Sequence, residues 1–318
     1  MNVMCEHIHI DTDTESKSKS TSTSSNIFFD FIGRFDITTD TDNSNSNSKY
    51  VGDWPGIGIR FSIISLPNVN EDRYINITFG DIDVGGYYVD SFLDCVSQGR
   101  TLMNSDNSIV TISIPKQQNE HEHEYIYNVV IKKSTEADDQ GLFTIDFALP
   151  NVIQYSDGIK LIPYYNNINN NTNNTNNQLI CDENNQLQHK RYNMLIIGDS
   201  LTAGYGDLGA MPCSYSIETE DSLVSWGSIV AAMTASDVQL VAWSGKGVVR
   251  NYGDDNPTSD NPMPTYYNRT VATDSSTYYT PPTNTNTNTN KALDIALVFL
   301  GTNDFSTEPV PSQEQFMA

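Results

Sequence analysis

The chain has 318 residues, a length that suits two ordinary domains, although a hydrophobic share of 37% predicts that part of it is not packed. Its 40 acidic residues outnumber 17 basic ones, and the formal net charge of −23 argues against a nucleic-acid or anionic-membrane partner, since both need a basic face. No stretch approaches the roughly 20 apolar residues of a membrane-spanning helix.

The N-terminus and the cysteines bear on the compartment. Met1–His7 carries neither a basic nor an apolar region, so no secretory signal peptide is predicted for the chain as written. The four cysteines lie far apart and include no CxxC pair, which argues against a zinc ribbon and a dense disulfide framework. They are Cys5, Cys95, Cys181 and Cys213. We therefore expect reduced thiols and a cytoplasmic location.

Polar tracts without apolar residues divide the chain. They cover Asp11–Ser25, Asn166–Asn177 and Thr283–Asn290, with a shorter loop-like tract at Asp40–Ser48. Such tracts are typical of disordered insertions or linkers. The expected organisation is a disordered tail at residues 1–25, a first domain at 26–165, an Asn/Thr-rich linker at 166–190 and a second domain at 191–318.

The first domain shows the alternation of apolar and polar residues that a half-buried strand needs. Val110, Ile112 and Ile114 alternate with polar residues, and Phe143–Leu149 repeats the pattern. Turn residues separate such segments, and no long helix is indicated before residue 190. The pattern predicts an antiparallel β-sandwich whose inner face includes the three alternating residues. Further strands are expected at Ile27–Asp36, Gly58–Leu66, Arg73–Phe79 and Glu124–Lys132.

After the asparagine-rich tract the pattern changes to that of an α/β domain. Apolar runs predict strands at Met194–Ile197, Val238–Trp243 and Ile295–Leu300. The first is continuous, as a strand covered on both faces requires. A helical stripe over Ser222–Thr234, with Asp221 or Ser222 as N-cap, lies between the first two strands. This order predicts a parallel sheet with right-handed crossovers.

Each of these strands is followed by residues that suit nucleophilic catalysis. Ser200 follows the first strand, Gly245-Lys246-Gly247 the second and Asn303 the third. Ligands of parallel sheets bind beyond the carboxyl ends of the strands, so we expect these groups on one rim. A serine can supply a nucleophile, glycines let a backbone N–H approach an oxyanion, and an amide adds a donor. The GDSL context of Ser200 differs from the G-x-S-x-G elbow of α/β-hydrolases.

Three blocks of the sequence resemble those of the GDSL, or SGNH, hydrolases. IIGDSLTAGYG is similar to the first block, WSGKGVVRNY to the second and VFLGTNDFS to the third. The second block, followed by Met263-Pro264 and Tyr266, most resembles carbohydrate esterase family 2, acetyl xylan esterase-like enzymes. GRFD from Gly33 and WPGIGI from Trp54 look like that family's opening motifs. The resemblance spans about residues 26–310 and implies a jelly-roll β-sandwich followed by a three-layer α/β SGNH domain.

The family pattern implies roles for the matched residues. Ser200 would be the nucleophile. Its backbone N–H, that of Gly247 and the side-chain amide of Asn303 would form the oxyanion hole, with Gly245 as the alternative to Gly247. Asp199 would brace the loop or cap a turn.

Three further side chains in the second block have less specific expectations. Tyr252 is either a sugar-stacking platform or a partly buried core aromatic, because an amphipathic ring suits both environments. Arg250 and Lys246 are expected to be structural or solvated.

The general base of the family has no counterpart. A serine hydroxyl needs a base, which in SGNH enzymes is a histidine downstream of the asparagine block. Residues 304–318 contain none, so we expect the last strands of the sheet to be missing as well. All 5 histidines precede Ser200, and the nearest, His189, lies before the first strand. His121-x-His123 has a weak metal-ligand pattern that also suits a solvated hairpin loop, and we assign no metal.

The resemblance implies an ester hydrolase that removes acetyl groups from polysaccharide through an acetyl-Ser200 intermediate, without a cofactor. The expected partner is an acetylated carbohydrate. A competing interpretation is a catalytically impaired relic, or a carbohydrate-binding protein, that keeps the oxyanion cleft but lacks the histidine. A protein-binding scaffold is a third interpretation, with no specific feature behind it. Members of the family are usually exported, in contrast to the location expected from the N-terminus.

Overall fold

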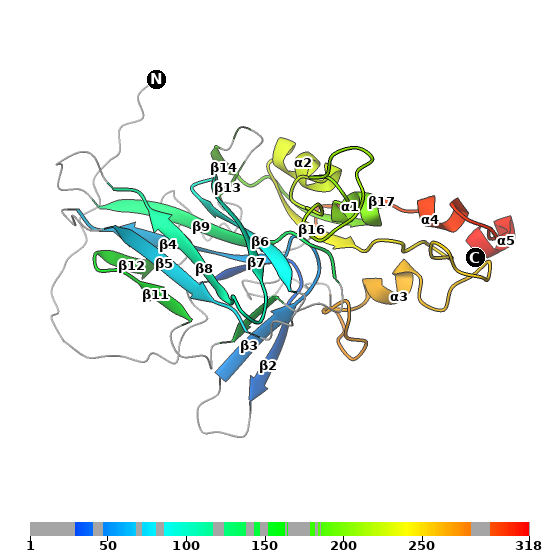
Figure 1. The fold of residues 1–318 in the computed structure, drawn as a ribbon, viewed down its shortest axis with the longest axis horizontal. Helices are drawn as coiled ribbons and strands as arrows, with labels where there is room; N and C mark the ends of the chain where they lie inside the picture. Colours follow the sequence, from blue (N-terminus) through cyan, green and yellow to red (C-terminus); the bar gives the residue numbers. More distant parts are fainter. Residues whose placement is uncertain are drawn as a thin grey trace.

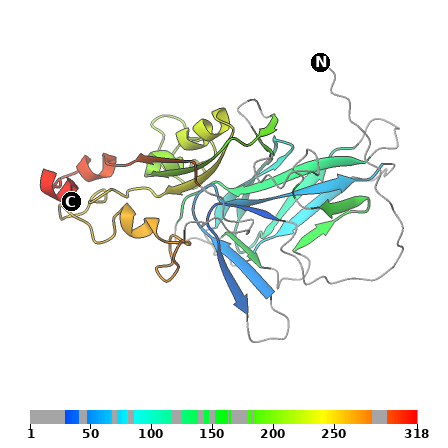
Figure 2. The ribbon, with the colours of Figure 1, turned by 180° about the vertical axis from the view of Figure 1, so that it is seen from behind.

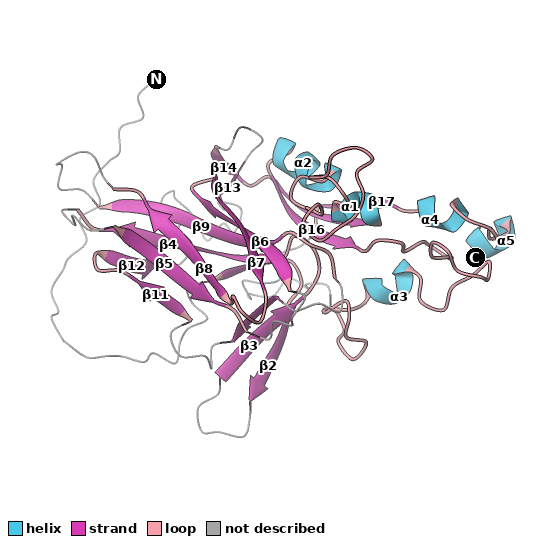
Figure 3. Ribbon diagram, in the orientation of Figure 1, coloured by secondary structure: helices cyan, strands magenta, loops and turns pink. Residues whose placement is uncertain are grey.

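The structure is a computed structural model, shown in Figure 1. It describes residues 29–40, 47–67, 72–80, 86–116, 124–137, 143–146, 152–162, 164, 179–181, 184, 186–280 and 293–317. The three long polar tracts, His121 and His123 lie outside the described residues. Figure 3 shows the division of the described residues into a part built from strands (residues 29–164, here the antiparallel part) and a part that mixes helices and strands (residues 192–317, the parallel part).

The antiparallel part contains three sheets, and its described residues form no helix. The largest sheet has the order β1-β4-β9-β6-β7, with β12 also paired to β4, and the others have the orders β10-β3-β2 and β11-β5-β8. The strands are β1 (Asp30–Ile32), β2 (Asp36–Asp40), β3 (Asn47–Gly52), β4 (Gly58–Ser65), β5 (Arg73–Thr78), β6 (Tyr87–Leu93), β7 (Val96–Met103), β8 (Ile109–Ile114), β9 (Tyr125–Lys133), β10 (Phe143–Asp146), β11 (Ile153–Tyr155) and β12 (Ile159–Ile162).

The predicted alternation in this part is confirmed. Val110, Ile112 and Ile114 on β8 are buried, while the residues between them are exposed. They share one core with Phe61 of β4 and Ile131 of β9, so the sheets pack face to face around apolar side chains. Burial of each such side chain stabilises the fold by about 1.5–3 kcal/mol. This free energy favours the strand pairing in which the alternating apolar residues face the core.

The parallel part is built on a three-stranded sheet of order β16-β15-β17. The parallel register places Gly198 of β15 opposite Ala242 of β16 and Phe299 of β17, so the three carboxyl ends lie at one edge. A small hairpin, β13 (Leu179–Cys181) and β14 (Leu187–His189), precedes it. The elements are α1 (Ser200–Ala203), α2 (Trp226–Met233), α3 (Met263–Tyr267), α4 (Thr302–Phe305), α5 (Gln313–Met317), β15 (Tyr192–Gly198), β16 (Ser236–Ala242) and β17 (Ile295–Phe299). None of the described helices is long and apolar enough to cross a membrane.

The two faces of this sheet pack against different partners. Met194 and Ile196 of β15 contact a cluster that includes Ala231 of α2. Leu195, which points to the opposite face, joins the core of the antiparallel part together with Met263 of α3. Figures 1 and 2 show α1 and α2 on one side of the sheet and α3 on the other. The parallel sheet is therefore covered partly by helices and partly by the antiparallel part.

The helix predicted over residues 222–234 is shorter than expected. It begins at Trp226, with Ser225 as N-cap, and neither Asp221 nor Ser222 caps it. The Asp221 carboxylate instead accepts the Leu223 N–H at 2.9 Å, within a turn that precedes the helix. The competing local hydrogen bond explains the late start of α2.

Polar contacts join the two parts and account for the motifs near residues 33 and 54. Arg60 of β4 forms a bidentate ion pair with Asp237 of β16, at 3.2 and 2.7 Å. The Asp53 carboxylate accepts the Ala272 N–H at 2.6 Å and the Thr273 N–H at 2.9 Å. Arg34 Nη1 donates a hydrogen bond to the Arg269 carbonyl at 3.1 Å. These bonds fix residues 267–273 of the parallel part against the antiparallel part.

The expectation of reduced thiols is wrong for two of the cysteines. Cys95, in the turn between β6 and β7, forms a disulfide with Cys181 of β13. The two residues are 86 positions apart, and their pairing depends on the fold bringing the hairpin onto the antiparallel part. Cys213 is a free cysteine, and Cys5 lies outside the described residues.

Candidate active site

Ser200 lies at the point where β15 turns into α1. Asp199 is the N-cap, and its carboxylate accepts the Leu201 N–H at 3.1 Å, so the capping interpretation of this aspartate is confirmed. Gly198 precedes it, and a Cβ there would lie 1.9 Å from Thr202 Oγ1. Only glycine fits this strand-to-helix turn, which accounts for the glycine of the GDSL motif.

The segment after β16, residues 244–250 (here the 244–250 loop), is held by one aspartate. The buried carboxylate of Asp304 accepts the N–H groups of Val248 at 2.9 Å, Val249 at 2.7 Å and Arg250 at 2.9 Å. Three backbone donors on one carboxylate form a strong, charge-assisted anchor. Gly247 sits so close to this anchor that a Cβ would lie 2.6 Å from Asp304 Oδ2.

Asn303 of α4 links this helix, which follows β17, to the 244–250 loop. Its side-chain Nδ2 donates to the Lys246 carbonyl at 2.8 Å, so the structure brings the third predicted block against the second. An amide nitrogen carries two protons, and the second remains for another acceptor. The Gly247 N–H donates a long hydrogen bond of 3.3 Å to Asn251 Oδ1. Gly245 has a left-handed backbone conformation, with a φ of 75°. The choice between these two glycines as oxyanion donors stays a prediction.

The other residues of the second block separate into exposed and structural side chains. Tyr252 is 60% exposed, which rules out the core-aromatic interpretation, while its N–H donates to the Gly245 carbonyl at 2.8 Å. Arg250 is buried and donates to backbone carbonyls, among them that of Thr307 at 2.9 Å. Lys246 lies over the Trp243 ring. The expectation of a structural role holds for Arg250.

A histidine that could act as base on Ser200 is absent from the described residues. The one histidine among them, His189, is exposed and ends β14. It precedes β15, a strand of 7 residues that spans roughly 23 Å, while Ser200 lies beyond the other end of that strand. The described residues also contain no group of three His, Cys, Asp or Glu side chains that could hold a metal ion.

Two aspartates near the rim have raised pKa values. Burial raises the pKa of Asp199, and the nearby charge of Asp304 adds to the effect. Burial raises the pKa of Asp221 to about 6, with a further contribution from Asp90. Arg100 of β7 lies 3.5 Å from the Asp221 carboxylate and favours its charged form. Acidic groups therefore surround the segment that enters α2.

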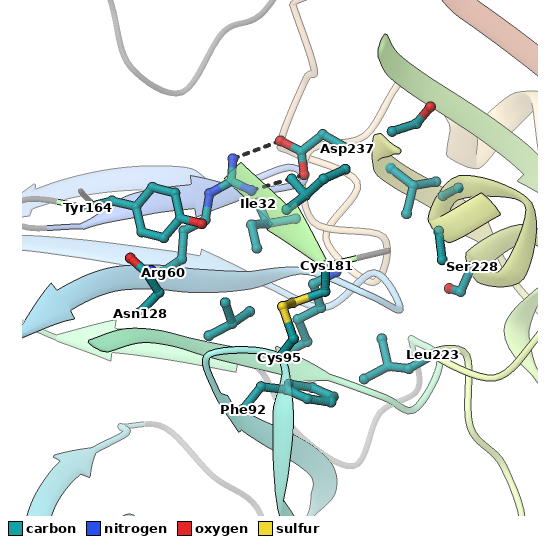
Figure 4. Close-up of a pocket in the computed structure, with 17 residues that line it drawn as sticks. Ile32, Arg60, Phe92, Cys95, Asn128, Tyr164, Cys181, Leu223, Ser228 and Asp237 are labelled. Carbon is teal, nitrogen blue, oxygen red and sulfur yellow. Dashed lines mark hydrogen bonds and ion pairs between the residues drawn. A yellow bond between two sulfur atoms is a disulfide. The ribbon is translucent and has the colours of Figure 1, made fainter. Parts of the chain in front are cut away.

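A cavity of about 200 Å³ lies elsewhere, between the two parts of the molecule. Figure 4 shows the residues that line it, among them the Arg60–Asp237 ion pair, the Cys95–Cys181 disulfide and Leu223. None of Ser200, Gly247, Asn303 or Tyr252 lines it. The cavity belongs to the junction between the parts and not to the predicted site.

Two residues that shape the rim were missed by the sequence analysis. Asp304 stands in the third block, and its position after Asn303 was the available signal. Glu136, in the segment after β9, has a carboxylate that accepts the Ser244 N–H at 2.5 Å. The local sequence around Glu136 carries no signal for this contact, because the acceptor and donor are 108 residues apart.

Comparison with known proteins agrees with this geometry. Residues 194–317, which include nearly all of the parallel part, match the GDSL-like lipase/acylhydrolase family. The acetylxylan esterase/glucomannan deacetylase of Cellvibrio japonicus is 31% identical over 124 residues, which are 38% of this chain and 32% of that protein. The cellulase/esterase CelE of Acetivibrio thermocellus is 32% identical over 113 residues, 35% of this chain and 12% of that protein.

Solved structures extend the likeness in fold to about nine-tenths of this chain. The carbohydrate esterase family 2 enzyme with a carbohydrate-binding domain from Corynascus thermopiles (Myceliophthora fergusii) aligns with a TM-score of 0.62 and 23% identity, over 89% of this chain and 68% of that one. The family two carbohydrate esterase from Clostridium thermocellum, solved with cellohexaose, gives a TM-score of 0.57 and 21% identity, over 91% and 70% of the two chains. The arrangement of an antiparallel part before a parallel part is thus shared with these structures.

Proposed function

We propose that the chain is a carbohydrate O-acetyl esterase of the SGNH type, which removes acetyl groups from polysaccharide. The observation that carries the proposal is the junction of the three blocks: β15, β16 and β17 end at one edge, and Asn303 bonds to Lys246 there. The family match and the names of the two curated relatives support it. The acetylated carbohydrate is the proposed substrate.

The finer architecture is part of the same proposal. The antiparallel part is a jelly-roll domain at residues 26–165, joined by a linker at 166–190 to an SGNH domain at 191–318. β17 is an edge of the described parallel sheet, and Val298 and Phe299 on it are 65% and 48% exposed. We propose that this edge is where a complete SGNH sheet adds further strands.

In the proposed reaction, Ser200 Oγ attacks the carbonyl carbon of the acetyl ester. The Ser200 proton passes to solvent, and the tetrahedral oxyanion is held by the Asn303 amide and by backbone N–H groups of Ser200 and Gly247 or Gly245. Collapse of this intermediate breaks the bond to the sugar oxygen, which takes up a proton. Water then hydrolyses acetyl-Ser200 and releases acetate. Each oxyanion donor contributes about 3 kcal/mol to the transition state.

The chain assayed by itself is expected to be a slow esterase, because no histidine among its described residues lies at the rim. General base catalysis contributes about 10²–10⁴-fold. The same observation, together with the exposed ring of Tyr252, favours carbohydrate binding as the second candidate function. A binding protein would retain acetylated oligosaccharide without releasing acetate.

The test is acetate release from acetylated xylan and from p-nitrophenyl acetate by the wild type and by Ser200→Ala. The proposal expects slow release by the wild type and none above background by the variant. Equal rates would contradict it. Turnover at about 1–10³ s⁻¹, typical of enzymes, would show that another group acts as base, and His189→Ala would then be the first variant to examine.

The compartment also enters as a proposal. The Cys95–Cys181 disulfide supports folding in an oxidising compartment, since cytosolic thiols are kept reduced. We therefore propose an exported protein in place of the cytoplasmic location expected from the N-terminus.

A further inference from the structure

We infer that Glu136 of the antiparallel part is a positioning residue for the 244–250 loop, and so for the oxyanion donor that this loop carries. The kinetic part of this inference rests on the proposed esterase function, while its structural part does not. The Glu136 carboxylate crosses from one part of the molecule to the other and accepts the Ser244 N–H at 2.5 Å. Ser244 is the first residue of the loop.

The backbone around Glu136 is rigidly held. Lys133, at the end of β9, is buried and donates its Nζ to the carbonyls of Asp53 at 3.0 Å, Thr135 at 2.8 Å and Glu136 at 2.6 Å. The Glu136 N–H donates to Glu220 Oε1 at 3.0 Å. An ammonium group that binds three carbonyls stabilises the turn, so the Glu136 side chain extends from a backbone that several hydrogen bonds hold.

The surrounding chain adds contacts of the same kind. The Ser222 N–H donates to the Ser134 carbonyl at 2.8 Å, and Arg100 Nη2 donates to the Glu220 carbonyl at 2.5 Å. Residues 134–136 are therefore bonded to the parallel part at Glu220, Ser222 and Ser244. Glu136 is buried, so the bond to Ser244 is protected from competition with water.

The path from this contact to the predicted donor is short. The Lys246 N–H closes a turn on the Trp243 carbonyl at 3.3 Å, and Ser244 lies inside that turn. The Lys246 carbonyl then accepts from Asn303, and Gly247 follows directly. The loop is thus held at its start by Glu136, in its middle by Asn303 and at its end by Asp304. Of these three anchors, only Glu136 comes from the antiparallel part.

The test compares Glu136→Ala and Glu136→Gln with the wild type in the full chain. Hydrogen exchange of the peptide covering 243–250 should accelerate about tenfold in Glu136→Ala. The change should be smaller in Glu136→Gln, whose amide oxygen can still accept the Ser244 N–H. In Ser200-dependent hydrolysis of p-nitrophenyl acetate, kcat should fall about tenfold in the alanine variant with KM unchanged, since loss of a donor outright costs ~10²–10³-fold. Glu124→Ala is the control, because Glu124 is an exposed residue just before β9. This variant should change neither the exchange rate of residues 243–250 nor kcat.

Two results would overturn the inference. Exchange of 243–250 in Glu136→Ala at the wild-type rate would show that the contact does not hold the loop. Faster exchange over the whole molecule to the same degree would show a general structural role instead of a positioning one. Hydrolysis that does not depend on Ser200 would refute the proposed function, and the exchange measurement would still decide the role of Glu136.

Discussion

Asp221 shows how a single buried side chain makes the junction of the two parts sensitive to pH. Its carboxylate is buried and faces Arg100 and Asp90 of the antiparallel part, and Asp207 lies near it within the parallel part. Burial raises its pKa to about 6, from the ordinary value of 3.8 for an aspartate. Between these two pH values the folded protein holds a proton that the unfolded chain releases, so this group lowers stability as the pH rises from about 4 to 7.

We expect Asp221→Asn to remove this dependence. An asparagine carries no charge, and its carbonyl oxygen can still accept the Leu223 N–H. The free energy of unfolding of the variant relative to the wild type should increase between pH 4 and pH 7 by up to about 3 kcal/mol, which corresponds to the pKa shift. Urea denaturation at intervals of one pH unit measures it. A difference that stays constant with pH would contradict the assignment, and Asp260→Asn, at an exposed position, serves as the control.

The edge at which three of the candidate site residues lie could be predicted from the sequence, because each residue follows a strand in a short motif, while their catalytic roles stay predictions. Ser200, Gly247 and Asn303 stand directly after apolar runs, and a parallel sheet delivers such positions to one edge. Glu136 could not be found in this way, because its contact with Ser244 depends on how the two parts dock. The disulfide between Cys95 and Cys181 was missed for the same reason.

The 244–250 loop is the element on which the site depends most. A Cβ on Gly247 would lie 2.0 Å from the Arg250 carbonyl oxygen and 2.6 Å from Asp304 Oδ2, closer than real Cβ contacts. Both neighbours are held in place, so they cannot yield without breaking the Asp304 anchor. The absence of a side chain at this position is therefore a requirement of the loop itself.

We expect Gly247→Ala to displace the loop and to lower Ser200-dependent acetate release by about 10²-fold, the effect of losing an oxyanion donor. Gly209→Ala is the matched control, since its Cβ would meet nothing nearer than the Gly206 carbonyl oxygen at 3.1 Å. Steady-state rates with p-nitrophenyl acetate and circular dichroism separate lost activity from lost folding. A fully active Gly247→Ala protein would refute the role of the loop.

At the scale of elements, strands were predicted better than the helix. Alternation specifies one buried face, and β4, β5, β8 and β9 lie within a residue or two of their predicted ranges. Among the strands that were not predicted is β7, whose first four residues are exposed and whose sequence does not alternate. The helix start was misplaced because Asp221 can cap a turn as readily as a helix.

The molecule as a whole is held together by a core and a covalent bond that both cross between its parts. Leu195 and Met263 of the parallel part belong to the core of the antiparallel part, and the disulfide ties the β13–β14 hairpin to the β6–β7 turn. The two parts are therefore expected to unfold together.

We expect Cys95→Ser to lower the free energy of unfolding by about 2–5 kcal/mol, because the disulfide closes a long loop of the unfolded chain. Denaturation in guanidinium chloride, with and without a reductant, measures this. The reductant should destabilise the wild type and leave the variant unchanged. Cys213→Ser, at the free cysteine, is the control. A wild-type protein that is insensitive to reduction under unfolding conditions would contradict the presence of the bond.

The central claim is that Ser200 is a nucleophile presented beside an oxyanion-binding loop. Covalent labelling with an alkyl fluorophosphonate tests it most directly, because phosphonylation needs the same attack and the same donors as ester hydrolysis. Intact mass and peptide mapping of the full chain should show one adduct, on Ser200, and none on Ser200→Ala. Labelling that is absent from Ser200, or that falls equally on other serines, would contradict the claim.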